Sequence, residues 1–175
     1  MRMNAQIHRV FTTMLLLAVV VCFVSGNALA GKVAIDKGTK VEVRFDLGAK
    51  ISSKTSLVGD TVAIKLSAPI LIGGQVIVDE GAEGKAVVAD IQKNGKVGKP
   101  GEITVNFVSL NAKGAFSVPG GGVIPLTGSI TDRGKGKKIL SILFIAGLLI
   151  KGGNGEIDTG VAYPATVAES VILEN

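Results

Sequence analysis

The sequence predicts an all-β fold, a small antiparallel β-barrel or barrel-like sandwich with one short apolar insertion that is a helix or a hairpin. Three observations indicate it. Apolar and polar residues alternate with a period of two in several short stretches, Gly-rich reversals separate these stretches, and no long apolar stripe of helical period follows residue 30. Such alternation gives a strand one buried and one solvated face, and evenly spaced short strands are typical of barrels and sandwiches.

The first thirty residues have the features of a cleaved secretory signal peptide. Arg2 and Arg9 are its positive region, residues 14–24 are an eleven-residue apolar run, and Ala28-Leu29-Ala30 has the small-x-small pattern of a cleavage site. The run is shorter than the roughly 20 residues of a membrane-spanning helix, which disfavours an uncleaved anchor. We expect cleavage after Ala30, which leaves 145 of the 175 residues as a single domain in the periplasm.

The strands are expected where the alternation is clearest. It runs through residues 40–45, 61–66 and 102–107, where every second residue is Val, Ile, Leu or Phe. Gly73-Gly74 separates two further apolar runs and reads as a two-residue hairpin turn. No Pro- or Ser-rich linker divides residues 31–175, so we expect one barrel domain with the insertion at about 133–153.

A short motif, Ile or Val followed by Asp-x-Gly, occurs three times and is interpreted as a structural turn. An Asp side chain can accept a hydrogen bond from the backbone two residues on, and Gly can adopt a positive φ. Convergence of the three aspartates on a cation is the disfavoured alternative, because a hard cation needs six or more oxygens. The turn residues are Asp36 and Gly38, Asp79 and Gly81, and Asp158 and Gly160.

Composition removes most catalytic chemistry from the exported chain. His8, Cys22 and the three methionines all lie within the first thirty residues, so the expected mature chain, which begins at Gly31, contains none of them. Without His or Cys there is no thiolate or imidazole metal site and no Ser-His or Cys-His pair. We therefore expect no enzyme, no metal and no cofactor, and a hydrolase with a carboxylate or Ser-Lys mechanism is the least favoured interpretation.

The charge of the exported chain is mildly basic. Removing Arg2 and Arg9 from 19 basic residues leaves 17 against 14 acidic residues, a net charge of +3. Nucleic-acid-binding proteins combine a much stronger basic footprint with aromatic side chains that stack on bases. Aromatic residues make up only 4% of this chain, so we expect no nucleic-acid partner.

Residues 139–150, ILSILFIAGLLI, are the feature that needs a functional explanation. They are apolar on every side, with Lys137-Lys138 before them and Lys151 after them. Twelve residues rise about 18 Å as a helix, which is short of a hydrocarbon core of about 30 Å.

Three interpretations of this segment stay open. It is buried against the barrel, or its apolar part enters lipid while the lysines contact anionic head groups, or it forms an interface with another protein or a second copy of the chain. In the second and third cases the contact residues are Lys135, Lys137, Lys138, Leu140, Leu143, Phe144 and Leu148.

The order of the turn motifs resembles the C-terminal β-barrel domain of TrbI-type scaffold proteins of conjugation and type IV secretion. The resemblance rests on Gly38-Thr39, on 51–62, on Val78-Asp79-Glu80-Gly81, on 98–101 and on 125–128. It implies a barrel in which an apolar helical insertion between strands contacts or crosses the outer membrane, and 139–150 falls at the corresponding place. The family's uncleaved anchor and Pro-rich spacer are absent from this sequence, and Phe107 stands in a strand that usually carries Trp or Arg.

These observations together predict a non-enzymatic structural or binding protein of the cell envelope. Its expected location is the periplasm, in association with the outer membrane, and its expected partners are the membrane surface or an envelope protein, self-association included. The alternative is a soluble periplasmic binding module in which 139–150 is part of the core.

Overall fold

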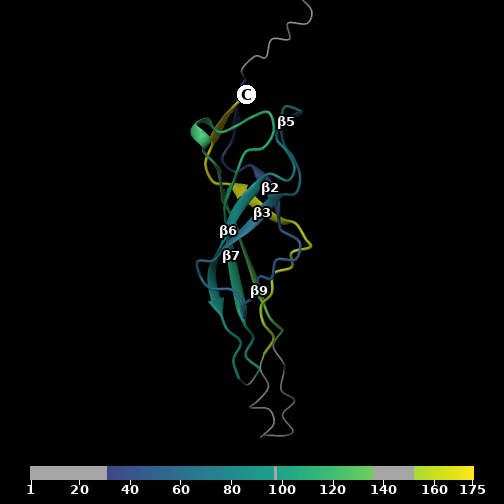
Figure 1. The fold of residues 1–175 in the computed structure, drawn as a ribbon, viewed down its shortest axis with the longest axis vertical. Helices are drawn as coiled ribbons and strands as arrows, with labels where there is room; N and C mark the ends of the chain where they lie inside the picture. Colours follow the sequence, from purple (N-terminus) through teal and green to yellow (C-terminus); the bar gives the residue numbers. More distant parts are fainter. Residues whose placement is uncertain (1–30, 97, 136–151) are drawn as a thin grey trace, which may run out of the picture. The chain divides into compact units, whose positions relative to one another are not determined.

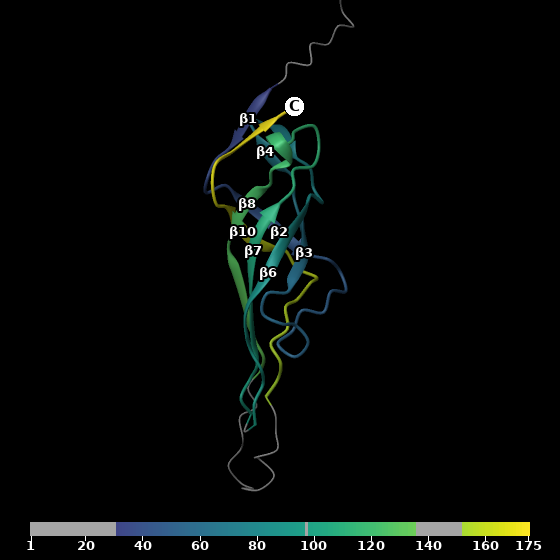
Figure 2. The same ribbon diagram turned by 60° about the vertical axis from the view of Figure 1, so that its left-hand side comes forward.

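The computed structural model describes residues 31–96, 98–135 and 152–175. The compact unit Gly31–Asn175 contains eleven strands and one short 3₁₀ turn within these residues (Figures 1 and 2). The strands are β1 (Lys32–Ile35), β2 (Lys40–Phe45), β3 (Thr61–Leu66), β4 (Ile70–Ile72), β5 (Gln75–Val78), β6 (Glu83–Gln92), β7 (Glu102–Leu110), β8 (Ile124–Thr127), β9 (Ser129–Arg133), β10 (Tyr163–Val167) and β11 (Val171–Glu174), and the 3₁₀ turn η1 is Pro119–Gly121.

Six of the strands close into an antiparallel barrel, which confirms the predicted fold class. The order is β6-β3-β2-β10-β8-β7, and β7 pairs back with β6. Strand β9 continues the sheet beyond β7, while β1 pairs with β11 and β4 with β5 in separate two-stranded sheets. The apolar insertion expected at about 133–153 falls largely within 136–151, outside the described residues.

The alternation in the sequence places the core as predicted. Strand β2 alternates strictly between exposed and buried residues, and in β7 the side chains of Ile103, Val105 and Phe107 are buried. The Phe45 ring lies 6.2 Å from that of Phe107 and 5.8 Å from that of Tyr163, measured between centroids. These spacings are within the usual range of packed aromatic pairs, so the three rings tie β2, β7 and β10 together inside the barrel.

Strand β6 closes the barrel by pairing on both sides. Residues 83–87 pair with β3, and residues 84–92 pair with β7 through two register shifts, between Lys85 and Ala86 and between Val88 and Asp90. Bulges of this kind bend a strand and increase its twist. The bend lets the second half of β6 leave β3 and continue with β7 and β9 as a three-stranded extension of the barrel wall.

Pro164 lies in the barrel wall without disrupting its ladders. It belongs to β10 and lies opposite Glu42 of β2, and the pairing of β10 with β8 covers only Thr166 and Val167. Proline has no backbone N–H and is tolerated where a strand lacks a neighbour on one side. The short overlap between β8 and β10 therefore explains how Pro164 is accommodated.

The Gly73-Gly74 reversal forms the predicted β4–β5 hairpin. The two glycines have φ values of +59° and +83°, and Ile72 pairs with Gln75 directly across the turn. Positive φ at both central residues belongs to the tight turn that matches the twist of the flanking strands. The hairpin lies near the C-terminus, whereas β9 lies toward the opposite end of the barrel (Figure 1).

Candidate functional site

Only one of the seven predicted contact residues lies within the described residues. Lys135 is described and exposed. The remaining six lie outside the described residues, within 136–151, and are Lys137, Lys138, Leu140, Leu143, Phe144 and Leu148. The described residues on either side of that segment, up to Lys135 and from Gly152, therefore define where the segment is attached.

Both attachment points lie at the tip of the β6–β7–β9 extension. The backbone N–H of Gly153 donates to the carbonyl of Lys135 at 3.1 Å, and the N–H of Gly152 donates to the carbonyl of Gly95 at 3.4 Å. The Asn94 side-chain amide donates to the Gly152 carbonyl at 2.8 Å. Segment 136–151 thus begins and ends at one place, beside the loop that joins β6 to β7.

Backbone hydrogen bonds continue this junction into the sheet. Gly101 donates to the Gly153 carbonyl, and Gly134 donates to the Gly101 carbonyl, both at 2.9 Å. Gly101 lies immediately before β7 and Gly134 immediately after β9, so the bonds join the strand ends to the chain that returns at Gly152. The attachment is consequently part of the hydrogen-bonded sheet.

Four glycines, which we call the glycine clamp, bring these backbones into contact: Gly101, Gly134, Gly152 and Gly155. A Cβ atom at Gly152 would overlap the Lys99 carbonyl and lie 2.7 Å from the Pro100 nitrogen, and one at Gly155 would lie 2.5 Å from the Asp132 carbonyl oxygen. None of the four has a φ in the left-handed region. The clamp therefore requires glycine for space and not for backbone conformation.

Ser53 fills the centre of the clamp. Its side chain is fully buried, its hydroxyl accepts the N–H of Gly155 at 3.0 Å, and a Cβ at Gly101 would overlap that hydroxyl. Its own N–H donates to the Gly155 carbonyl at 2.9 Å. Ser53 is one of the few buried polar residues of the described chain, and its hydrogen bonds hold the returning segment against β7.

The loop between β6 and β7 adds positive charge to this tip. Lys93, Lys96 and Lys99 are exposed there, as is Lys135 across the junction, and we call these four residues the lysine collar. The loop is held by bonds from Gly95 N–H to the Lys99 carbonyl at 2.9 Å and from Lys99 N–H to the Lys96 carbonyl at 3.4 Å. The sequence interpretation included Lys135 alone of the four.

The acidic side chains at the ends of β7 and β9 already have partners. Glu102 lies 3.8 Å from the guanidinium of Arg133, and a carboxylate oxygen of Asp132 accepts the N–H of Glu156 at 2.8 Å. Among the ion pairs found within the described residues, none includes a collar lysine. The loop 93–101 itself contains no acidic residue, so its three lysines make this part of the tip positively charged.

The predicted structural turns lie elsewhere in the barrel. Gly38 and Gly81 have positive φ, at +90° and +74°. The Asp158 carboxylate accepts the Gly160 N–H at 2.8 Å, but Gly160 has no left-handed φ. At this turn the side-chain bond occurs without a left-handed glycine, and the Tyr163 hydroxyl adds a 2.7 Å bond to the Asp158 carbonyl.

The first two aspartates of the motif have a different role from Asp158. The Asp36 carbonyl accepts the N–H and the hydroxyl of Thr39, and the Asp79 carbonyl accepts the N–H of Ala82. Within residues 31–96, 98–135 and 152–175, no group of three or more His, Cys, Asp or Glu side chains is arranged to hold a metal ion. The three aspartates occupy separate turns.

Two shallow hollows of about 330 and 360 Å³ lie on the outer wall of the barrel. The first is lined by residues of β2 and β4 with Pro164, and the second by residues of β3 and β6 with Asn111. No residue of the glycine clamp or the lysine collar lines either hollow.

None of the helical structure in the described part of the chain is long and apolar enough to cross a membrane. Comparisons with protein-family models, with curated proteins and with solved structures found no match to this chain.

Proposed function

We propose that this protein is a non-enzymatic structural or binding protein of the cell envelope, exported to the periplasm, whose segment 139–150 contacts the membrane. The observation that carries the proposal is the attachment of 136–151 at a single basic tip of the barrel. Lys135 and Gly153 are joined there by a backbone bond, beside the exposed Lys93, Lys96 and Lys99. An apolar segment attached in this way can enter one leaflet and return.

Exposing the apolar side chains of segment 139–150 to water is unfavourable. The segment contains nine large apolar side chains of Ile, Leu and Phe. Moving each from water to an apolar environment gains roughly 1.5–3 kcal/mol, an upper limit before ordering costs. The sum is on the order of 10 kcal/mol or more, comparable with the whole stability of a domain. A lipid leaflet supplies the cover that such a segment needs.

The flanking charges agree with an interfacial location. Lysines lie on both sides of the segment in the sequence, at 137, 138 and 151. Lysines at the edge of an apolar membrane segment contact anionic head groups. The resemblance of the turn motifs to TrbI-type barrels, in which an apolar insertion contacts the outer membrane, supports the same assignment.

Flotation with lipid vesicles tests the proposal. The exported protein, purified from the cell envelope, is mixed with vesicles of phosphatidylethanolamine and phosphatidylglycerol, and a density gradient separates bound from free protein. We expect wild type to float and a variant with Leu143→Ser, Phe144→Ser and Leu148→Ser to remain at the bottom.

The control removes apolar surface from the opposite end of the barrel. Leu71 and Val76 face each other across the β4–β5 hairpin and are 56% and 42% exposed, so Leu71→Ser with Val76→Ser should leave flotation unchanged. The proposal is wrong if folded wild type stays at the bottom, or if the triple variant floats like wild type. It is also wrong if the triple variant loses its cooperative thermal unfolding, because the segment is then part of the core.

A further inference from the structure

The lysine collar is assembled from two parts of the chain that are distant in sequence. Lys93, Lys96 and Lys99 come from the loop between β6 and β7, and Lys135 follows β9. Gly152 and Gly153 connect the two parts, because Gly152 donates to the Gly95 carbonyl and Gly153 to the Lys135 carbonyl. The four lysines therefore belong to the two backbone segments that meet where segment 136–151 leaves and rejoins the barrel.

The backbone that presents the lysines is held by short-range packing. A Cβ at Gly95 would lie 3.3 Å from the Lys99 Cβ, and the clamp glycines leave no space for a side chain between the strand ends. Holding the charged stems on a fixed backbone reduces the entropy lost on binding. The collar is thus a set of four flexible lysine side chains that leave a fixed backbone near one junction.

The charge of the collar has no partner within the described residues. The loop 93–101 contains three lysines and no acidic residue. At the strand ends beyond it, Glu102 pairs with Arg133, and the Asp132 carboxylate accepts the Glu156 N–H and keeps its negative charge. A lysine ammonium is a compact charge that binds phosphate oxygens through up to three N–H donors. Several lysine ammonium groups near the attachment point of an apolar segment are suited to bind the phosphate layer of a bilayer.

We propose that the lysine collar binds the phosphate groups of anionic lipids and so makes membrane attachment selective for anionic membranes. The inference rests on the proposed membrane contact and adds its lipid class. The apolar segment supplies affinity for any bilayer, and the collar adds affinity where the surface is negative. Because the collar is exposed, salt screens its contribution strongly.

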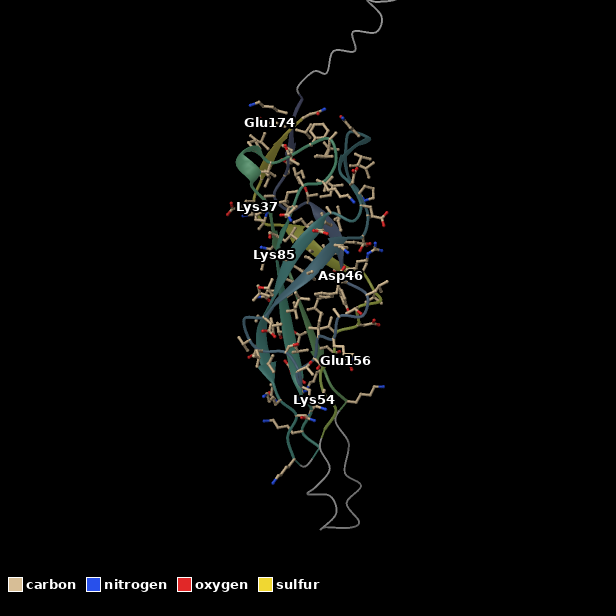
Figure 3. The ribbon with its side chains drawn as sticks, in the orientation of Figure 1. Lys37, Asp46, Lys54, Lys85, Glu156 and Glu174 are labelled. Carbon is tan, nitrogen blue, oxygen red and sulfur yellow. The ribbon has the colours of Figure 1, made fainter. Side chains whose placement is uncertain are left out.

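The test compares vesicles of pure phosphatidylcholine with vesicles of equal parts phosphatidylcholine and phosphatidylglycerol, at low and high salt. The collar variant carries Lys93→Gln, Lys96→Gln and Lys99→Gln. The control variant loses the same charge elsewhere, through Lys37→Gln, Lys40→Gln and Lys85→Gln. All three control lysines are exposed, and Lys37 and Lys85 lie on the part of the ribbon away from Lys54 and the tip of the extension (Figure 3).

We expect wild type to partition into the anionic vesicles more strongly than into the neutral ones at low salt. The collar variant should lose this preference by on the order of a hundredfold, since each of the three lysines near an anionic surface adds roughly a fivefold gain. The control variant should keep most of the preference. All three proteins should bind neutral vesicles equally.

The possible results distinguish failure of the collar inference from failure of the proposed membrane contact. If the collar and control variants show the same preference for anionic vesicles while wild type still binds neutral vesicles, the collar inference is wrong and the proposed membrane contact stands. If wild type binds neither kind of vesicle, both are wrong. Binding of wild type and the collar variant to a DNA duplex is measured alongside. If the collar variant keeps its preference for anionic vesicles but loses binding to the duplex, the surface is a nucleic-acid site and the lipid inference is overturned.

Discussion

At the scale of single residues, glycine has two distinct roles in this protein. At Gly38, Gly81 and the Gly73-Gly74 hairpin it supplies a positive φ in an open turn. In the glycine clamp it supplies space, because Gly152 lies against the Lys99 carbonyl without a left-handed backbone. The second role makes the clamp sensitive to a single methyl group.

Gly152→Ala is therefore expected to destabilise the protein by about 2–3 kcal/mol, the usual effect of forcing an extra group into a well-packed site. Urea unfolding measures the loss. Gly95→Ala is the matched control in the same junction, because its nearest neighbour is a flexible lysine stem and not a backbone carbonyl. Equal losses for the two variants would show that the close approach at Gly152 does not contribute to stability.

The sequence motif indicates the bond at Asp158, and no local signal indicates the clamp. An Asp-x-Gly motif is local, so the bond from Gly160 N–H to the Asp158 carboxylate could be anticipated from spacing alone. Contacts between Gly152 and Lys99 join residues far apart in the chain, and nothing local indicates them. The composition of the sequence could have indicated the collar, because the stretch 93–99 is rich in Gly and Lys, as is 134–138.

At the scale of elements, β6 determines whether the barrel closes. Gly84 lies in this strand opposite Ile64 of β3 and Leu110 of β7. A Cβ there would overlap the Ser109 carbonyl and lie 2.8 Å from the Leu110 side chain. The close approach allows β6 to pair with both neighbours where it joins the two sides of the barrel.

Gly84→Ala should accordingly destabilise the barrel by about 3 kcal/mol, because both neighbouring strands must move to admit the methyl group. Gly73→Ala, in the open β4–β5 turn, adds a Cβ at positive φ without a clash and should cost about 1 kcal/mol. Thermal or urea unfolding of the two variants gives the comparison. A Gly84→Ala protein as stable as the Gly73→Ala protein would contradict this account of closure.

Element prediction succeeded where one strand face is buried and failed where burial is irregular. Strands β2 and β7 alternate cleanly in both sequence and structure. Strand β9, Ser129–Arg133, has no buried residue and therefore no apolar face to detect. The bulges of β6 shift its faces, so its period of two is lost after Val88. A search for alternating apolar and polar residues therefore cannot detect β9 or the second half of β6.

At the scale of the whole molecule, the barrel has a core of its own, and the apolar segment is attached to one end of it. The described strands build a continuous core that includes Phe45, Ile64 and Leu110, each at most 1% exposed. The segment is attached at the tip of the β6–β7–β9 extension through backbone bonds and glycine contacts. The fold class followed from the sequence, whereas the place of attachment required the strand order and register.

The central claim is that 139–150 enters the membrane, and a single fluorescent label tests it directly. Cys22 is the only cysteine of the chain and precedes Ala30, so Phe144→Cys in a protein that begins at Gly31 gives one site for an environment-sensitive dye. Leu71→Cys, at an exposed position of the β4–β5 hairpin, gives the matched control.

We predict that anionic vesicles shift the emission of the dye at residue 144 to the blue, and that quenchers within the acyl chains reduce it, because the label moves from water into hydrocarbon. The dye at residue 71 should show neither change. Unchanged emission at residue 144 in the presence of bound vesicles, or an equal shift at both sites, would contradict the account.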